Sequence, residues 1–317
     1  MSKTINTMEI GSVIETELLV TEKSLFPKKN GDQFLRLQFA DISGTIKGVA
    51  WEDGPKIAQR IKVGDVVRVK GEVSDYKGPQ LVIQNIVVVP ADQVDRKRFQ
   101  RTANRDSTEM VATLYQEIAQ INGVFLGGLL EQIFTSKRFL AAFVATPAGK
   151  SIHHSYAGGL IEHSLEVLSI CKTFVTLYPR INADLLYAGA LLHDIGKTAE
   201  YEPDNMAYNM TTAGQLLGHI TMGVRLVDEY VRAIPAFPAD LHLELTHMIL
   251  AHHGQKEWGS PEVPKTLEAY ALSYADMASA KINQFIQILD QGADNHDAQW
   301  IWAQPLERNI YGRTLQI

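Results

Sequence analysis

The hydrophobic pattern of this chain changes its period once, close to residue 90. From about Ile10 to Val89, apolar residues alternate with polar ones, which is typical of strands. After Ser107 the apolar residues recur every three to four positions, as they do on one face of a helix. A length of 317 residues is enough for two domains. We therefore predict an α+β chain with a β domain followed by an all-α domain.

The β half reads as five strands with one short helix between the third and fourth. In the segment Phe34–Phe39, Leu35, Leu37 and Phe39 share one face, and turn-forming residues separate this strand from its neighbours. This order of elements is that of a five-stranded OB-fold barrel. We predict an OB-fold nucleic-acid-binding domain over residues 1–90 and a basic linker over 91–106. A helical domain with a C-terminal tail is predicted over 107–317.

OB-fold barrels bind single strands by combining basic side chains with aromatic stacking surfaces. The candidates for such a surface are Phe34, Arg36, Lys47, Trp51 and Tyr76. The alternative for Phe34 and Trp51 is that they only cover the end of the barrel core.

The linker is strongly basic, through Arg96, Lys97, Arg98, Arg101 and Arg105. Charge runs of this kind are commonly solvated linkers, and the alternative is a track for phosphate groups.

The second half predicts a series of helices separated by prolines. The first begins at Ser107–Glu109 and ends at Asn122-Gly123. Further helices are predicted over 125–134, 136–145, 158–177, 182–194, 212–232, 239–252 and 264–290. The tail carries Trp300, Trp302 and Tyr311, which we expect to pack against the body of the chain or a second subunit.

Composition excludes several classes of protein. The single cysteine, Cys171, excludes a disulfide framework, and the chain has no Cys-x-x-Cys pattern. A net charge of −6 argues against coating nucleic acid through bulk positive charge. The N-terminus lacks a signal-type apolar core, and no run of about 18 apolar residues predicts a membrane span. We expect a cytoplasmic protein.

Histidine and aspartate residues that lie far apart in the chain form a candidate metal site. They are His163, His193, Asp194, His219, His252, His253 and Asp276. Imidazole and carboxylate together suit manganese, iron, cobalt or zinc. A carboxylate beside a histidine can bridge two ions, and a bridged pair cleaves phosphoesters. We expect two divalent ions, with manganese as the first choice.

Two positions in this set have a specific helical context. Asp276 lies in the middle of a predicted helix among apolar neighbours, which is costly unless a positive charge neutralises it. His219 is expected on an inward helical stripe with Leu216, Met222 and Leu226.

The ordered set His, His-Asp, His, His-His, Asp, each on its own helix, resembles the HD superfamily of metal-dependent phosphohydrolases over residues 150–290. A narrower resemblance rests on the segment Ser151–His163, which contains His153-His154, then Gly-Gly-Leu, then His163. Together with the domain order, this segment is similar to the YhaM family, bacterial 3′-to-5′ exoribonucleases with an N-terminal OB domain and a C-terminal HD domain.

The resemblance implies a role for each residue. The first ion is expected on His163, His193, Asp194 and Asp276, and Asp194 would bridge to a second ion. His219 and His252 would hold that second ion, with His253 as a further ligand or as outer support, and the choice between His252 and His253 stays open. Lys197, His153 and His154 are expected to contact the phosphate or the leaving group. The alternative for His153 is a surface residue that caps a helix.

The resemblance implies hydrolysis of single-stranded RNA from its 3′ end to nucleoside 5′-monophosphates, with single-stranded DNA as an alternative substrate. We also expect a homo-oligomer, because the compact helical half and the aromatic tail suggest a shared surface. One competing interpretation is an HD phosphohydrolase that acts on free nucleotides or a cyclic dinucleotide. Another is an OB-fold DNA- or RNA-binding replication factor whose helical half is only a scaffold.

Overall fold

A computed structural model describes residues 4–76, 78–95, 98–99, 105–149, 156–204, 207–292, 299–303 and 306–312. The chain divides into two compact units. One comprises Met1–Arg101, Pro203–Tyr208 and Ile288–Ile317, and the other comprises Thr102–Glu202 and Asn209–Gln287. The domain boundaries at residues 90 and 106 stay a prediction.

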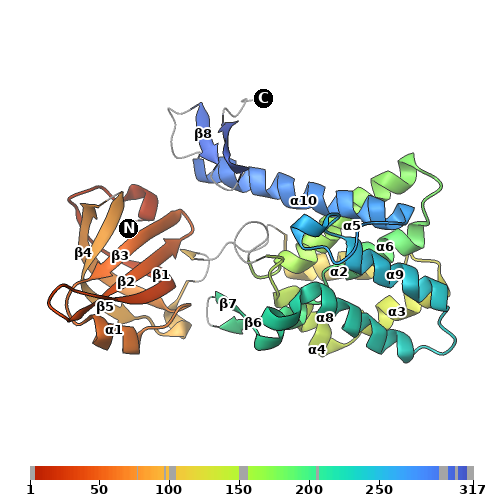
Figure 1. Cartoon of the computed structure of the whole chain (residues 1–317), viewed down its shortest axis with the longest axis horizontal. Coiled ribbons are helices and arrows are strands. Elements are labelled where there is room, and N and C mark those ends of the chain that lie inside the picture. Colours follow the sequence, from red (N-terminus) through yellow and green to blue (C-terminus); the bar gives the residue numbers. More distant parts are fainter. Residues whose placement is uncertain are drawn as a thin grey trace. The chain divides into compact units, whose positions relative to one another are not determined.

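The first unit contains a closed five-stranded barrel (Figure 1). After the short 3-10 helix η1 (Ile5–Thr7), its elements are β1 (Val13–Pro27), β2 (Gln33–Asp41), β3 (Gly44–Ala50), α1 (Gly54–Arg60), β4 (Val66–Asp75) and β5 (Pro79–Val88). The strand order is β1-β2-β3-β5-β4, with a parallel pairing of β3 and β5. The predicted five strands, with a helix between the third and fourth, are confirmed.

Alternating burial explains why these residues form a barrel. In β2, Leu35, Leu37 and Phe39 are buried in the barrel core, whereas Phe34 and Arg36 point outwards. A period of two places successive side chains on opposite faces of a strand. The pattern therefore specifies which face of β2 closes on the core and which face stays available for binding.

The segment that follows the barrel is attached to it. After the 3-10 helix η2 (Ala91–Gln93), the Phe99 side chain is buried against Leu19 and Val66. Arg98 donates to the Glu17 carboxylate at 2.9 Å. The charge of Arg98 is therefore paired, while the candidate linker residues 96, 97 and 101 lie outside the described residues.

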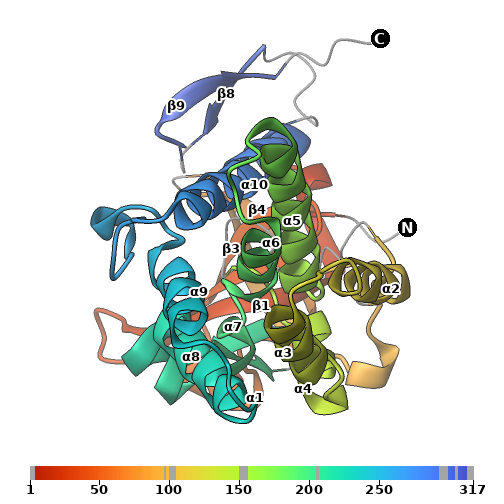
Figure 2. The same ribbon diagram turned by 90° about the vertical axis from the view of Figure 1, so that its right-hand side faces the viewer.

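The second unit is helical, and Figure 2 shows α5 and α6 at its centre. Its helices are α2 (Ser107–Ile118), α3 (Val124–Phe134), α4 (Lys137–Ala145), α5 (Gly159–Leu177), α6 (Ala183–Leu192), α7 (Lys197–Glu200), α8 (Thr212–Arg232) and α9 (Ala239–Ala251), together with most of α10 (Leu267–Gly292). Apolar residues of these helices form one core, in which Cys171 is buried. The N-cap of α2 is Asp106, one residue before the predicted start.

A kink in α8 contradicts part of the helical pattern. Gly218 adopts φ 70° and ψ 156°, which are not helical values. Leu216 lies before this kink and is 78% exposed, so the expectation that it shares an inward face with His219 is wrong. A positive φ is readily adopted only by glycine, and it turns the first residues of α8 away from the stripe that follows.

Two short hairpins were not predicted from the sequence. One pairs β6 (Tyr201–Asp204) with β7 (Ala207–Met210), and the other pairs β8 (Trp300–Ala303) with β9 (Arg308–Tyr311). Ala303 and Ile310 are buried against Ile288, whereas the aromatic residues expected to pack, Trp300, Trp302 and Tyr311, are exposed. Among the residues described, none of the helices is both long and apolar enough to cross a membrane.

A close approach between two backbones positions the turn after α6. Gly196 has an ordinary φ of −67°. A Cβ at this position would lie 2.0 Å from the His219 carbonyl oxygen and 2.4 Å from the Gly223 nitrogen. Only a glycine leaves room for α8 here, so this residue sets how closely His219 approaches the turn.

We predict that Gly196→Ala destabilises the helical unit by about 1–3 kcal/mol, because the added methyl group must push α8 away. The matched control is Gly128→Ala in α3, where a Cβ would meet nothing within 4 Å. Alanine is favoured over glycine inside helices, so the control should be neutral or stabilising. Denaturant unfolding followed by circular dichroism measures both, and equal stabilities would contradict this explanation.

Candidate metal centre

The seven predicted ligands come from five helices and their ends. His163 lies in the first turns of α5, and Asp276 lies in the middle of α10. His193 is the C-cap of α6 and His252 is the C-cap of α9, so Asp194 and His253 follow directly after a helix end. His219 follows the kink in α8. His163, His193, Asp194 and His252 are all buried, each with at most 2% of the residue exposed.

One group of side chains converges around a single carboxylate oxygen. The His163 Nε2 atom lies 3.2 Å from His193 Nε2 and 3.1 Å from Asp276 Oδ1. Asp194 Oδ2 lies 3.3 Å from His193 Nε2 and 3.6 Å from His163 Nε2. Two imidazoles and two carboxylates therefore surround one position.

A second group faces the other oxygen of the same carboxylate. Asp194 Oδ1 lies 3.5 Å from His219 Nε2 and 3.6 Å from His252 Nε2. These three atoms are buried and have no hydrogen-bond partner among the described residues. Ligand atoms of His219, His252 and His253 lie within 4.8 Å of one another. Buried polar atoms without partners are costly, and a shared cation would satisfy all three.

Backbone acceptors fix the orientation of three of the imidazole rings. His193 and His252 each direct Nδ1 at the carbonyl three residues earlier, at 2.9 and 2.7 Å. His253 Nδ1 lies 3.2 Å from the Trp258 carbonyl. A carbonyl oxygen only accepts, so Nδ1 must carry the proton in each ring. The lone pair of Nε2 is then left for a ligand, as in most metal-binding histidines.

Burial controls the charge of the histidines. It lowers the pKa of His163 and His253 and holds the pKa of His252 well below its usual value, because a charged ring would lose its hydration. Burial also acts to lower the pKa of His193, but the two nearby carboxylates outweigh it and raise that pKa. Neutral imidazole is the form that binds metal ions.

The carboxylates are ionised despite their burial. Burial alone would raise the pKa of Asp194, but the positive charge of Lys197, with His193, holds it well below its ordinary range. The pKa of Asp276 is also lowered, since the neighbouring His163 and His193 rings outweigh the effect of burial. The centre thus combines imidazole nitrogen donors with anionic oxygen donors. This set fits divalent first-row metals.

Lys197 lies inside the centre rather than on its rim. It is 7% exposed, and its Nζ atom hydrogen-bonds to Asp194 Oδ2. Its ammonium group offsets one of the two negative charges. The other two predicted catalytic residues, His153 and His154, lie outside the described residues.

The candidate nucleic-acid-binding residues lie on the outer surface of the barrel. The Phe34 ring lies 4.6 Å from the Trp51 ring and 5.7 Å from the Phe26 ring. The Arg36 guanidinium lies 4.4 Å above Phe26. We call the three rings of Phe26, Phe34 and Trp51, together with Arg36, the aromatic row. Trp51 is 49% exposed. Phe26 was missed from the sequence because it lies near the end of β1, outside the segment Phe34–Phe39.

The two remaining candidates, Lys47 and Tyr76, are also exposed on the barrel. Lys47 is exposed on β3, where it pairs with Gln38 across the ladder. Tyr76 lies on the turn between β4 and β5 and is 63% exposed. Gln38 shares the outer face of β2 with Arg36 and Phe34, so Lys47 lies on the same face as the aromatic row.

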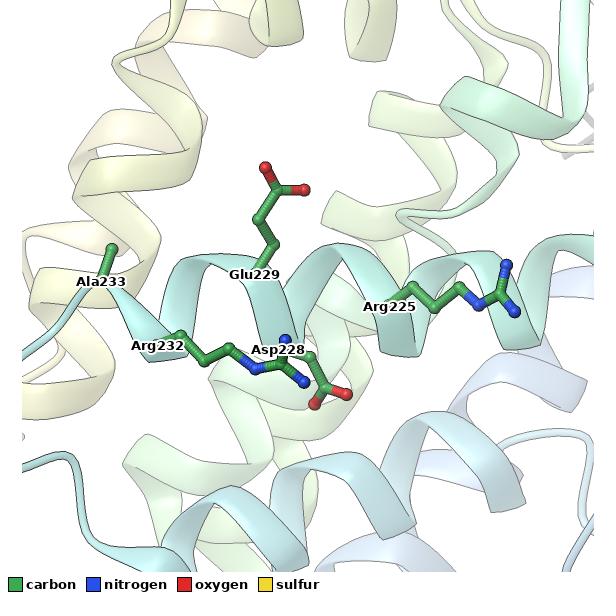
Figure 3. Close-up of a pocket in the computed structure, with 5 residues that line it drawn as sticks. All are labelled: Arg225, Asp228, Glu229, Arg232 and Ala233. Carbon is green, nitrogen blue, oxygen red and sulfur yellow. The ribbon is translucent and has the colours of Figure 1, made fainter.

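A surface hollow of about 620 Å³ lies on α8 and is lined by Arg225, Asp228, Glu229, Arg232 and Ala233 (Figure 3). Figure 3 shows Glu229 directed away from Asp228 and the two arginines. Asp228 is already engaged by His242 Nε2 at 2.6 Å. Alternating charges of this kind are typical of a solvated helix surface, so we assign the hollow no chemistry.

Comparison with known proteins agrees with both units. Residues 160–281 match the model of the HD domain, and residues 17–89 match an OB-fold nucleic acid binding domain. The chain is 34% identical to the 3′-5′ exoribonuclease YhaM of Bacillus subtilis over 92% of both chains. It is 32% identical to the YhaM of Halalkalibacterium halodurans, over 92% of this chain and 90% of that one. From the barrel, the metal centre and these relatives, the chain belongs to the YhaM family of 3′-5′ exoribonucleases.

Proposed function

We propose that the histidine–aspartate centre is the hydrolytic site of a metal-dependent 3′-5′ exoribonuclease, and that the barrel binds its single-stranded substrate. The relatives named above are 3′-5′ exoribonucleases. The observation that carries the proposal is the position of Asp194, whose two oxygens face two separate groups of Nε2 atoms. A carboxylate placed in this way can bridge two ions.

The two groups give the proposed ligand sets. His163, His193, Asp276 and Asp194 Oδ2 would hold one ion, while His219, His252 and Asp194 Oδ1 would hold the other. We assign His252 rather than His253 as the main ligand, because its Nε2 is buried and faces Asp194 Oδ1. His253 would add a further ligand. Manganese is our first choice among the ions that these donors accept.

When bound, two divalent ions would supply Lewis acidity and activate the attacking water. The oxygen of this water forms a bond to the terminal phosphorus, and the bond from phosphorus to the 3′-oxygen of the preceding nucleotide breaks. The products are a nucleoside 5′-monophosphate and an RNA one nucleotide shorter. The 3′-oxygen takes up a proton, for which His153 and His154 are the proposed donors. Lys197 places a positive charge where phosphoryl oxygens gain negative charge.

The aromatic row on the barrel supports binding of single strands without base selection. Each base can stack on an aromatic ring, and Arg36 with Lys47 adds positive charge for the phosphates. This mode of binding would accept single-stranded DNA as an alternative substrate. The exposed Trp300, Trp302 and Tyr311 of the β8–β9 hairpin support the prediction of a homo-oligomer, because large exposed aromatic residues are favoured at subunit interfaces.

We predict that Asp194→Ala lowers the rate of RNA shortening by more than about 100-fold, because it removes the group shared by both ligand sets. Shortening of 5′-labelled RNA in manganese measures the rate, and RNA binding should change less than about twofold. Glu229→Ala, which removes an exposed carboxylate of α8, is the control and should keep the wild-type rate. A fully active Asp194→Ala protein would exclude the bridging role.

Removal of divalent ions with a chelator should abolish RNA shortening. Manganese should restore it better than magnesium, because magnesium prefers oxygen ligands and this centre is rich in nitrogen. Metal analysis of the purified chain should give two manganese ions per chain after reconstitution. Full activity in magnesium with no transition metal bound would contradict the proposed ligand sets.

The double substitution Phe34→Ala with Trp51→Ala should weaken binding of single-stranded RNA by about 10-fold or more, because loss of a stacked base costs roughly 1–3 kcal/mol. The control is Tyr178→Ala, an aromatic residue of similar exposure at the end of α5. Fluorescence anisotropy with a labelled oligonucleotide measures both affinities. If both variants bind like the wild type, the aromatic row is not the binding surface.

A further inference from the structure

Two of the ligand histidines differ from the others in what holds their Nδ1 atom. The rings of His193, His252 and His253 use backbone carbonyls. His163 and His219 use side chains instead. His163 belongs to one proposed ligand set and His219 to the other. A substitution of the side chain that holds Nδ1 can therefore alter one histidine at each ion position.

The first of these contacts is a relay between α5 and α10. Ser279 Oγ donates to Glu166 Oε2 at 2.9 Å, and it lies 3.1 Å from His163 Nδ1. Since the hydroxyl proton is used for Glu166, the Ser279 oxygen accepts from His163, and Nδ1 must carry the proton. Asn283 donates to the same Glu166 oxygen at 2.7 Å and fixes the carboxylate.

The relay follows from the helical repeat. Glu166 lies three residues after His163 on α5, and Ser279 lies three residues after Asp276 on α10. Residues three apart are neighbours on one helix face. The face of each helix that supplies a metal ligand therefore also supplies a member of the relay one turn later. Ser279 is 3% exposed, so water does not compete for its hydroxyl group.

The second contact is direct. Glu200 Oε1 accepts from the backbone nitrogen of His219 at 2.9 Å and lies 3.3 Å from its Nδ1. Glu200 ends α7 and is 4% exposed. One carboxylate oxygen thus holds both the ring of His219 and the backbone just after the kink in α8. This arrangement leaves His219 Nε2 directed at Asp194.

We propose that Glu166 and Ser279 position His163 for one ion, and that Glu200 positions His219 for the other, so that the affinities of the two ions are set separately. This inference rests on the proposed function of the centre. Without the Ser279 oxygen, the proton of His163 would move to Nε2, where Asp276 Oδ1 at 3.1 Å accepts it. The lone pair that binds the ion would then be lost.

The test is calorimetric titration of the full chain with manganese. The wild type should bind two ions, and Ser279→Ala should weaken one binding step by about 10–100-fold while the other changes less than about twofold. The weakened step should be the one that His163→Ala removes. Glu200→Gln should weaken the other step, since a neutral amide is a poorer acceptor than a carboxylate.

Two variants separate positioning from a general loss of structure. Ser273→Ala removes a buried hydroxyl on the same helix that donates to the Tyr270 carbonyl, and this variant should bind manganese like the wild type. Ser279→Thr keeps the hydroxyl group and should restore the weakened step. If the wild type binds two ions and Ser279→Ala binds both unchanged, the positioning role is wrong. If the wild type binds no ion, the proposed function itself fails.

Discussion

The structure depends on a buried carboxylate that is shared between two groups of imidazoles. Asp194 is 2% exposed, and each of its oxygens faces Nε2 atoms rather than solvent. Such a site is unfavourable for an apolar core, because buried polar atoms need partners and buried charges need compensation. Lys197 compensates part of the charge. A pair of bound cations would compensate the remaining negative charge and bind the unpaired Nε2 and carboxylate oxygen atoms. The same buried groups that are costly without cations are thus the ones that would bind the catalytic ions.

Helix ends make this convergence possible. A side chain inside a buried helix packs against its neighbours, whereas a residue at a C-cap can leave the core. His193 and His252 occupy such positions, and the backbone carbonyls of the last turn hold their Nδ1 atoms. The same unsatisfied carbonyls that end an α-helix thus fix the tautomers of two ligands. Gly196 completes the arrangement, because it lets α8 bring His219 against the turn.

Much of this could be predicted from the sequence, because helix periods and helix ends leave local signals. The five-stranded barrel, the long helices and the position of His193-Asp194 at a helix end all follow from residues close together in the chain. The kink at Gly218 did not, because a glycine in a helical pattern can adopt either helical or positive φ values. The contact of Ser279 with Glu166 joins residues 113 apart, and no local pattern reports it. The choice between His252 and His253 likewise depends on the rotation of α9 at its end.

The central claim is that one carboxylate bridges two ions, and a crystal structure of the chain with manganese tests it most directly. Diffraction measured on both sides of the manganese absorption edge locates the ions without assuming their ligands. We expect two anomalous peaks about 3.5–4 Å apart, one beside Asp194 Oδ2 with His163 and His193, and one beside Asp194 Oδ1 with His219 and His252. A single peak, or two peaks that do not share Asp194, would contradict this account.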